Sequence, residues 1–498
     1  MNGHSYDDLI ETALDAIREV QRKTPEELRQ WVAQFLDFPP TIPHSNDRMI
    51  FTTREGYAAL KALGRRWHSS DLQRSKLLSR TAAEQLALHA FGTLLETSST
   101  IPNTADARSG LFTLMDQRLQ SRIQTEHFYF PARVFDEPEI QTFSVGPVTF
   151  YRRADWLDAV ETTADDPASW KQDVINKWTK PASRLGRIFW FVADGMTLAI
   201  IRRCPQSTLA HWLYSFGATR RYVDSVAQAV GPCEWIIDVE VEGRDRSRSS
   251  ECASVAALVA LDSLGLPMPA EAARNLRGPG RDLSPQFSHE LHQIQGEPLN
   301  MSSSVDWPRL GGPPGAQADL LSKNTSLRSS VGQAITAFVT VTDTGNAPNL
   351  LRRWIEAMYW FGQARHEHND FIALVKFGIA LDVLAKGGSA LGILDLCRAL
   401  FGKQANDVIA PDNRTLKQVV EKVYNEGRSR IAHGGSLALL RELPVELSLA
   451  DSLTAHSLAS YVVYASQYGG PDTYEAFLAA IPALRAAHAA ANTNSRKD

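Results

Sequence analysis

The first two thirds of the sequence lack the common short motifs of nucleotide, metal and nucleophile chemistry. They contain no G-x-x-x-x-G-K-[ST] phosphate loop, no G-x-G-x-x-G after a strand, no H-E-x-x-H and no G-x-S-x-G. Short sequence motifs therefore do not identify what this part of the chain binds.

Cysteine is scarce as well. The four cysteines, Cys204, Cys233, Cys252 and Cys397, are widely spaced, with no C-x-x-C pair and no matching His cluster. This pattern excludes a zinc signature and a disulfide framework, and it fits a reducing compartment.

No apolar run is long enough to cross a bilayer. The most apolar window, Ile188 to Ile201, is interrupted by Asp194 and is too short. Residues 1–20 are acidic and amphipathic, unlike the basic start and apolar core of a signal peptide. We therefore expect a soluble, cytoplasmic protein that does not enter a membrane.

Neither sign of charge dominates. The 52 Lys and Arg residues face 56 Asp and Glu residues, which gives a net charge of -4. This balance argues against a protein that binds nucleic acid through positive charge spread over its whole surface. Any contact with nucleic acid must therefore be local. With 498 residues, 44% of them hydrophobic, the chain is expected to form two or three globular domains of a mainly α class.

Helical patterns fill residues 1–110. Apolar residues recur at helical spacing from Ile10 to Ile17, and Thr24-Pro25-Glu26-Glu27 forms a capping box with proline at the first helical position. Long stretches without proline predict two further helices, at roughly 53–66 and 70–96.

Residues 111–346 have the pattern of an α+β region that could act as a sensor or regulatory domain. We expect a strand pair at 127–135 and 140–153, a strand at 234–242 and a helix at 250–264. The basic segment Gly243–Ser249 between the last two is favoured as a solvated hairpin tip over an RNA-phosphate contact. A Gly-, Pro- and Ser-rich linker with a strand-like run at 335–341 ends the region.

Residues 347–498 are predicted to be an α-helical bundle because strand patterns vanish after Asn349. Asp382 interrupts one apolar helix face. Since an isolated buried charge is costly, this carboxylate should have a donor or cationic partner unless the edge of the face is solvated.

The one concentrated motif is Lys422–Gly435, K-V-Y-N-E-G-R-S-R-I-A-H-G-G. Arg428 and His433 are separated here by four residues, and Ser429 follows the arginine. The motif lies at the end of a helical pattern that stops on two glycines.

Three upstream segments extend this observation: W-I-E-A-M-Y-W-F, F-I-A-L-V-K-F-G-I-A-L-D-V-L and L-C-R-A-L-F-G. With the motif, they make residues 347–498 resemble HEPN domains, particularly the Apea-like branch. The family pattern is Arg, often a polar residue, and His after four to six intervening positions, which Arg428, Ser429 and His433 match. Asp382 matches an acidic position that commonly accompanies the motif.

The resemblance implies a metal-independent endoribonuclease without a cofactor, working as a homodimer through this domain. Such enzymes serve as toxins and in antiviral defence, and here the N-terminal region would regulate the activity. The residue types suit the chemistry: a neutral His can move the proton of a ribose 2′-hydroxyl, and Arg can hold the scissile phosphate. Attack by the 2′-hydroxyl would cut RNA and spare DNA.

Helix geometry sets a condition on this hypothesis. Positions five apart lie about 140° apart on a regular α-helix, so Arg428 and His433 share a face only if the helix distorts or two chains combine. In a helical-wheel projection, Arg430 lies nearer the apolar face of the helix than Arg428 does. Arg428 is assigned to the site because its spacing from His433 matches the family pattern. An isologous dimer would place both residues of both chains in one cleft.

The residues leave other interpretations open. His433 can be an ordinary residue at a helix C-terminus with the glycines as caps, and the bundle a non-catalytic dimerisation or RNA- or nucleotide-binding module. The balance of 16 Lys and Arg against 15 Asp and Glu in residues 347–498 allows this. The only support for an enzyme in the N-terminal part of the chain is the size of that part. His366 and His368 diverge on a helix, so a solvated helix end is favoured over a metal site.

Overall fold

A computed structural model describes most of the chain. The described residues are 4–35, 38–43, 49–98, 101–160, 171–172, 174–175, 223, 225–231, 233–284, 286–292, 300–306, 309–342, 345–429 and 443–494, with side chains except at 286–292, 300–302, 306, 426–429 and 491–494. They confirm the mainly α class. None of the described helices is long and apolar enough to cross a membrane.

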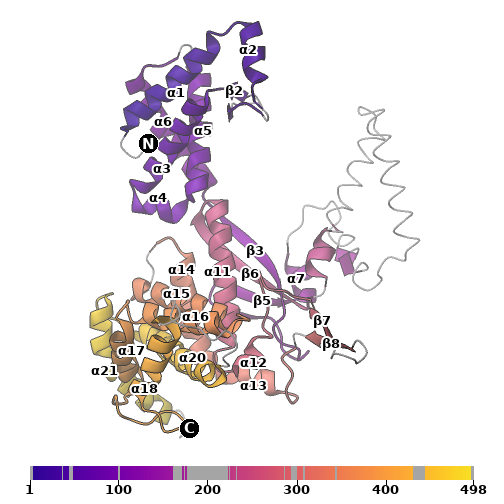
Figure 1. The fold of residues 1–498 in the computed structure, drawn as a ribbon, viewed down its shortest axis with the longest axis vertical. Coiled ribbons are helices and arrows are strands. Elements are labelled where there is room, and N and C mark those ends of the chain that lie inside the picture. Colours follow the sequence, from indigo (N-terminus) through magenta and orange to yellow (C-terminus); the bar gives the residue numbers. More distant parts are fainter. Residues whose placement is uncertain are drawn as a thin grey trace, which may run out of the picture. The chain divides into compact units, whose positions relative to one another are not determined.

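The chain divides into two compact units, and the first comprises Met1–Phe128, Glu240–Val255 and Phe338–Thr344. Its helices α1, α3, α5 and α6 pack in a closed ring in which each contacts the next and α6 returns to α1 (Figure 1). Trp67, Phe91 and Met115 belong to the core that they enclose. The elements are α1 (Tyr6–Gln21), α2 (Pro25–Val32), β1 (Thr41–Pro43), β2 (Met49–Phe51), α3 (Arg54–Ser69), α4 (Leu72–Leu77), α5 (Arg80–Thr97) and α6 (Thr104–Arg122).

Local signals place several of these helix boundaries. The capping box predicted at Thr24 is present, with proline at the start of α2. The single helix expected at 70–96 is divided into α4 and α5, because Ser79 caps the second helix by accepting the N–H of Ala82 at 3.1 Å. A β-carbon at Gly92 would lie 2.0 Å from the carbonyl oxygen of Pro43, so glycine lets the β1–β2 hairpin approach the backbone of α5.

The basic segment Gly243–Ser249 joins β6 (Trp235–Arg244) to α11 (Arg246–Leu264) and is not a solvated hairpin tip. Arg244 is 7% exposed and donates to the carbonyl oxygens of Phe338, Val339 and Thr340. Asp245 is buried and accepts the N–H of Arg248 at 3.3 Å. The prediction of a solvated loop was wrong because both ends of the segment are held by hydrogen bonds.

The second unit, Tyr129–Val239, Ala256–Ala337 and Gly345–Asp498, contains most of a four-stranded sheet. Its strand order is β3-β6-β5-β4, with β4 and β6 antiparallel to β5. The strands expected at 127–135 and 234–242 are present as β3 (Gln124–Ala132) and β6, and the run at 140–153 is divided into β4 (Phe143–Val145) and β5 (Val148–Arg152). The expected pairing was wrong, because β3 pairs with β6, while β4 and β5 pair with each other. The rings of Phe143 and Phe150 stack at 4.8 Å, and the indole of Trp235 donates to the carbonyl oxygen of Phe135 at 2.7 Å.

Shorter elements accompany this sheet. They are α7 (Arg153–Ala159), α12 (Ala270–Ala273), the antiparallel pair β7 (Gln286–His292) and β8 (Asn300–Asp306), α13 (Ala316–Lys323) and α14 (Thr325–Val339). The strand-like run expected at 335–341 is wrong, because α14 covers most of it. Two β-branched residues of this run, Ile335 and Val339, are buried side chains of that helix.

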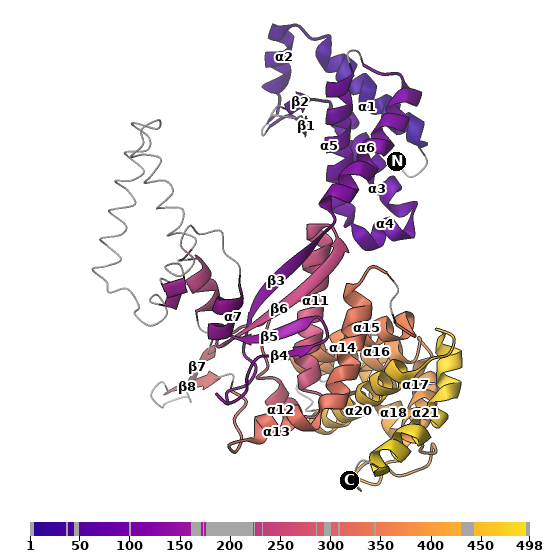
Figure 2. The same cartoon turned by 180° about the vertical axis from the view of Figure 1, so that it is seen from behind.

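The C-terminal part of this unit is the predicted helical bundle (Figure 2). It contains α15 (Pro348–Arg365), α16 (Asp370–Leu384), α17 (Ser389–Phe401), α18 (Leu416–Glu421), the π-helix η1 (Lys422–Ser429), α20 (Pro444–Gln467) and α21 (Tyr474–Asn494). The α15 and α16 helices pack against each other and against α20. The indole of Trp354 donates to the carbonyl oxygen of Leu458 at 2.8 Å, which ties α15 to α20.

Three cysteines are free and buried: Cys233, Cys252 and Cys397. Burial raises the pKa of each thiol, and for Cys397 it raises the pKa to about 12. Cys204 lies outside the described residues.

Candidate functional site

The motif-bearing helix changes its winding where the motif begins. Thr415 starts α18 with a capping box: its hydroxyl accepts the N–H of Gln418, and its own N–H donates to the Gln418 side chain. Leu416, Val419 and Val420 are buried at α-helical spacing. From Lys422 to Ser429 the backbone is a π-helix, in which each N–H bonds to the carbonyl five residues earlier. The helix is therefore distorted up to Ser429, whereas residues 430–433, over which the motif spacing requires a distortion, lie outside the described residues.

Arg428 and Ser429 are the last two residues of η1. Arg428 comes five residues after the buried Val423, which is one step of the π-helical hydrogen-bond pattern. The side chains of Arg428 and Ser429, and all of Arg430 and His433, lie outside the described part of the structure. That Arg428 and His433 form one site stays a prediction.

Asp382 lies on α16, and α16 packs directly against η1. Its side chain is half-buried and accepts the backbone N–H of Ser389 at 3.3 Å. The donor expected for this carboxylate is thus present, at the residue where α17 begins. The fold brings the acid-bearing helix against the arginine-bearing helix, although they are about 40 positions apart in the sequence.

An ion pair that sequence reasoning missed anchors the start of η1. Lys422 Nζ lies 3.0 Å from Glu446 Oε1 in the first turn of α20, and Glu446 is 8% exposed. A glutamate shortly after Pro444 is a common residue at a helix N-terminus. Nothing in the sequence pattern connects it with a lysine 24 positions earlier.

A buried ion pair ties α15 to α20 five residues further along. Arg365 Nε and Nη2 lie 2.6 Å and 3.0 Å from the two carboxylate oxygens of Asp451. The same guanidinium donates to the carbonyl oxygens of Gly265 and Met268. Arg365 therefore joins the segment after α11 to two helices of the bundle.

A second buried pair adjoins the first. Arg281 binds both oxygens of Asp262 at 2.6 Å and 2.7 Å, and both side chains are less than 10% exposed. His366 Nε2 lies 3.8 Å from the same carboxylate. Burial, and next the Arg281 charge, lower the pKa of His366 to about 3, against the opposing effect of Asp262. His366 is thus a largely buried, neutral histidine with a side chain that is 16% exposed, and the prediction of a solvated helix end was wrong for it.

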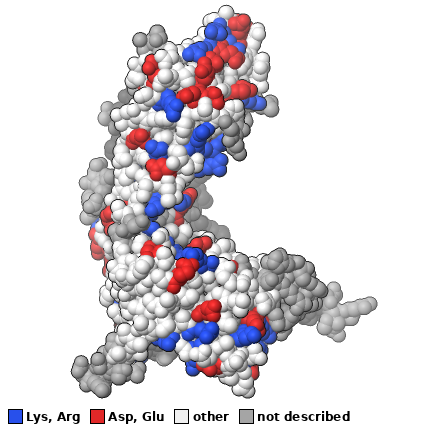
Figure 3. All heavy atoms as spheres, turned by 90° about the vertical axis from the view of Figure 1, so that its left-hand side faces the viewer, with Lys and Arg blue, Asp and Glu red and all other residues white. Residues whose placement is uncertain are grey.

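No group of three or more His, Cys, Asp and Glu side chains that could hold a metal ion occurs among the described residues. On the face in Figure 3, basic and acidic residues are interspersed rather than gathered into one field of either sign. No protein-family model matches the chain, and neither a characterised protein nor a solved structure shows significant similarity to it.

Proposed function

We propose that residues 347–498 form a HEPN-type, metal-independent endoribonuclease whose activity the rest of the chain regulates. One observation carries the proposal: the Arg428-bearing segment is a π-helix, and it packs against the helix that bears Asp382. π-Helical turns are rare and occur frequently at functional sites. Because η1 has more residues per turn than an α-helix, positions five apart within it, such as Val423 and Arg428, approach a common face. The proposal extends this winding to His433.

The proposed reaction uses this chain's own side chains. His433 takes the proton of a ribose 2′-hydroxyl, the 2′-oxygen forms a bond to phosphorus, and the bond from phosphorus to the 5′-oxygen breaks. A histidine returns a proton to the leaving 5′-oxygen. Arg428 holds the phosphate and the charge that grows on it, and Ser429 offers a further hydrogen bond. The products are a 2′,3′-cyclic phosphate and a 5′-hydroxyl.

Asp382 has a positioning role in this proposal. It lies beside η1 with its carboxylate already engaged by the N–H of Ser389. A carboxylate there favours the charged form of a nearby arginine and restricts its rotamers. A homodimer through the bundle supplies two copies of the motif, so that each cleft can use an acid and a base from different chains.

The experiment compares the full-length protein with Arg428→Ala and His433→Ala. We expect each variant to lose about 100-fold or more in the cleavage of single-stranded RNA in the presence of EDTA. Substrates with 2′-O-methyl groups and DNA of the same sequence should remain uncut, and the products should carry a cyclic phosphate. Expression of the wild type, and not of the variants, should slow growth.

Arg430→Ala is the matched control, since it removes the same charge two residues away and should be milder than Arg428→Ala. A stronger effect of Arg430→Ala would move the site to that residue. Unchanged cleavage in both Arg428→Ala and His433→Ala would dispose of the proposal. A stable dimer that binds RNA and leaves it intact would instead support a non-catalytic dimerisation or RNA-binding module.

A further inference from the structure

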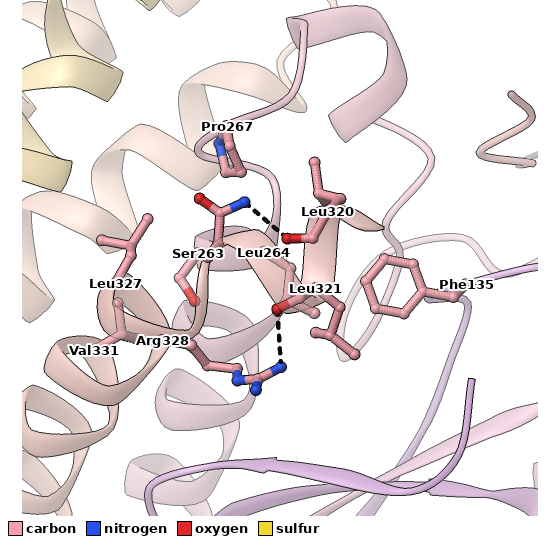
Figure 4. Close-up of a pocket in the computed structure, with 10 residues that line it drawn as sticks. Phe135, Ser263, Leu264, Pro267, Leu320, Leu321, Leu327, Arg328 and Val331 are labelled. Atoms are coloured by element: carbon pink, nitrogen blue, oxygen red, sulfur yellow. Dashed lines mark hydrogen bonds between the residues drawn. The ribbon is translucent and has the colours of Figure 1, made fainter. Parts of the chain in front are cut away.

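Leu327, in the first turn of α14, lines a narrow hollow and a wider one. The narrow hollow, between α11, α13 and α14, is shown in Figure 4 and leaves about 20 Å³ of room, which is about one water molecule. The wider hollow lies between α14, α20 and α21, is open to solvent and leaves about 210 Å³, which is room for several water molecules. Of the two, the wider hollow is large enough for a small organic ligand.

Half of the described lining of the wider hollow is apolar. Leu327 of α14 and Ala459 and Val463 of α20 form this part. The hydroxyl of Ser466 donates to the hydroxyl of Ser330 at 2.9 Å, which joins α20 to α14. Apolar side chains on packed helices suit the flat face of a ring.

Ser460 adds a hydroxyl that its own helix does not use. Thr454, Ser457 and Ser466 of α20 each donate to a carbonyl oxygen three or four residues earlier, at 2.6 Å, 2.7 Å and 3.0 Å. Ser460 is half-buried, and its hydroxyl forms no hydrogen bond with a described residue. Because a polar group withdrawn from water is costly without a partner, this hydroxyl is available to a ligand in the hollow.

Two aromatic side chains complete the lining. The rings of Tyr464 and His488 meet edge to face, with centres 6.2 Å apart and planes at 79°. Tyr464 is 8% exposed, and burial raises the pKa of its phenol against the opposing effect of Arg485. Neither the phenol hydroxyl nor the imidazole forms a hydrogen bond with a described residue. Each of these groups can both donate and accept a hydrogen bond.

The chemistry of the lining indicates the class of ligand. No Lys, Arg, Asp or Glu side chain is among the described residues that line the hollow, so a charged ligand would lose hydration without an ionic partner. A nucleobase is neutral, has flat faces for apolar and aromatic side chains, and carries donors and acceptors on its rim. A plain hydrocarbon would leave the three polar groups unpaired, and a sugar has no flat face.

We propose that this hollow binds one unpaired nucleobase, of a free nucleoside or of single-stranded RNA, whose rim pairs with Ser460, Tyr464 and His488. The proposal concerns binding alone and does not depend on ribonuclease activity. Glu446, where α20 meets η1, comes 13 positions before Ala459, which is about 20 Å along the helix. The hollow is therefore separate from the proposed cleavage site.

The test is calorimetric titration of the full-length protein with adenosine, with uridine and with single-stranded RNA made uncleavable by 2′-O-methyl groups. We expect at least one of the three to bind at millimolar concentration or below. Binding of a nucleoside alone would identify the free nucleoside as the ligand, and tighter binding of the RNA would identify a base within a strand. Ribose should not bind, and each 5′-monophosphate should bind no more tightly than its nucleoside.

Ser460→Ala and Tyr464→Phe each remove one hydroxyl and change little else. We expect each substitution to weaken binding of the nucleoside or the RNA by about 5-fold, the value of a neutral hydrogen bond. Ser452→Ala removes an exposed hydroxyl from the same helix and should leave the affinity unchanged. Ala459→Phe fills the hollow with the three polar groups in place and should abolish binding, while circular dichroism confirms that the variant is folded.

Absence of binding of both nucleosides and of the RNA to the wild type would overturn the proposal. So would Ser460→Ala and Tyr464→Phe variants that both bind as tightly as the wild type. A monophosphate that binds about 10-fold more tightly than its nucleoside would contradict a site for a neutral base.

Discussion

Lys422 at the start of η1 and Glu446 at the start of α20 form an ion pair, with Nζ 3.0 Å from Oε1. Five residues after Glu446, Asp451 of the same helix binds Arg365 at the end of α15. The first two turns of α20 therefore hold both the π-helix and the end of α15. This relationship gives the proposed site a support whose strength can be measured.

The Lys422–Glu446 pair should stabilise η1 locally. Lys422→Met leaves a buried carboxylate without this partner, so we expect a loss of about 2 kcal/mol in the free energy of unfolding. Hydrogen exchange should accelerate in residues 422–429. In a double-mutant cycle with Glu446→Gln, we expect a coupling energy of about 1 kcal/mol or more. A coupling energy of zero would show that the pair does not stabilise the protein.

The Arg365–Asp451 pair should matter much more than a surface pair. Asp451→Asn leaves a guanidinium that is 4% exposed without its carboxylate, and we expect a loss of about 3 kcal/mol. Lys323–Asp319 is the matched control, because its side chains are 73% and 66% exposed. Asp319→Asn should be almost neutral in urea unfolding. Equal effects of the two substitutions would contradict the difference in burial.

His366 should make stability depend on pH. In the unfolded chain its pKa is near 6.5, and in the folded protein burial and Arg281 lower it to about 3. Below pH 6.5 only the unfolded state takes up this proton, so the stability is complete above pH 6.5 and is lost as the pH falls toward 3. The slope from this group is about 1.4 kcal/mol per pH unit.

We expect His366→Gln to show a smaller loss of stability between pH 6 and pH 4.5 than the wild type in urea unfolding. His368→Gln alters an exposed histidine two residues away and should follow the wild type. Parallel pH profiles for wild type and His366→Gln would show that another group controls acid sensitivity in this range.

Gly362 allows α15 to approach the Asp262–Arg281 pair. A β-carbon at this position would lie 1.8 Å from Asp262 Oδ2. Alanine normally favours a helix interior by about 1 kcal/mol over glycine, but here we expect Gly362→Ala to destabilise by about 2 kcal/mol because the helix or the carboxylate must move. Gly469→Ala, where nothing lies within 4 Å, is the control. A thermal midpoint for Gly362→Ala at or above the control would refute the close approach.

Local patterns in the sequence were sufficient to predict that residues 347–498 form a helical bundle. Helix α17, Ser389–Phe401, is an example, because its apolar spacing and its flanking glycines are local signals. Helix α20 begins at Pro444, where proline is well placed at the first helical position. Ser448 and Asp451 have the spacing of a capping box, but both lie inside α20, and Asp451 binds Arg365.

Features that depend on distant partners could not be predicted in this way. The environment of His366 is set by Asp262 and Arg281, which come from a region about 100 residues earlier. The sequence did not predict that a π-helix begins at Lys422, because the apolar spacing up to Val423 is the same as in an α-helix. Asp382 is the exception: its need for a donor followed from charge on an apolar face, and Ser389 supplies that donor.

The buried thiols have a practical consequence for following motions of this protein. Since only the thiolate reacts rapidly with alkylating reagents, Cys233, Cys252 and Cys397 are protected while their surroundings remain closed. Their modification rates therefore report local opening before β6, in α11 and in α17 without any engineered label. If a ligand or an RNA stabilises one of these regions against local opening, the cysteine in that region alone should be alkylated more slowly.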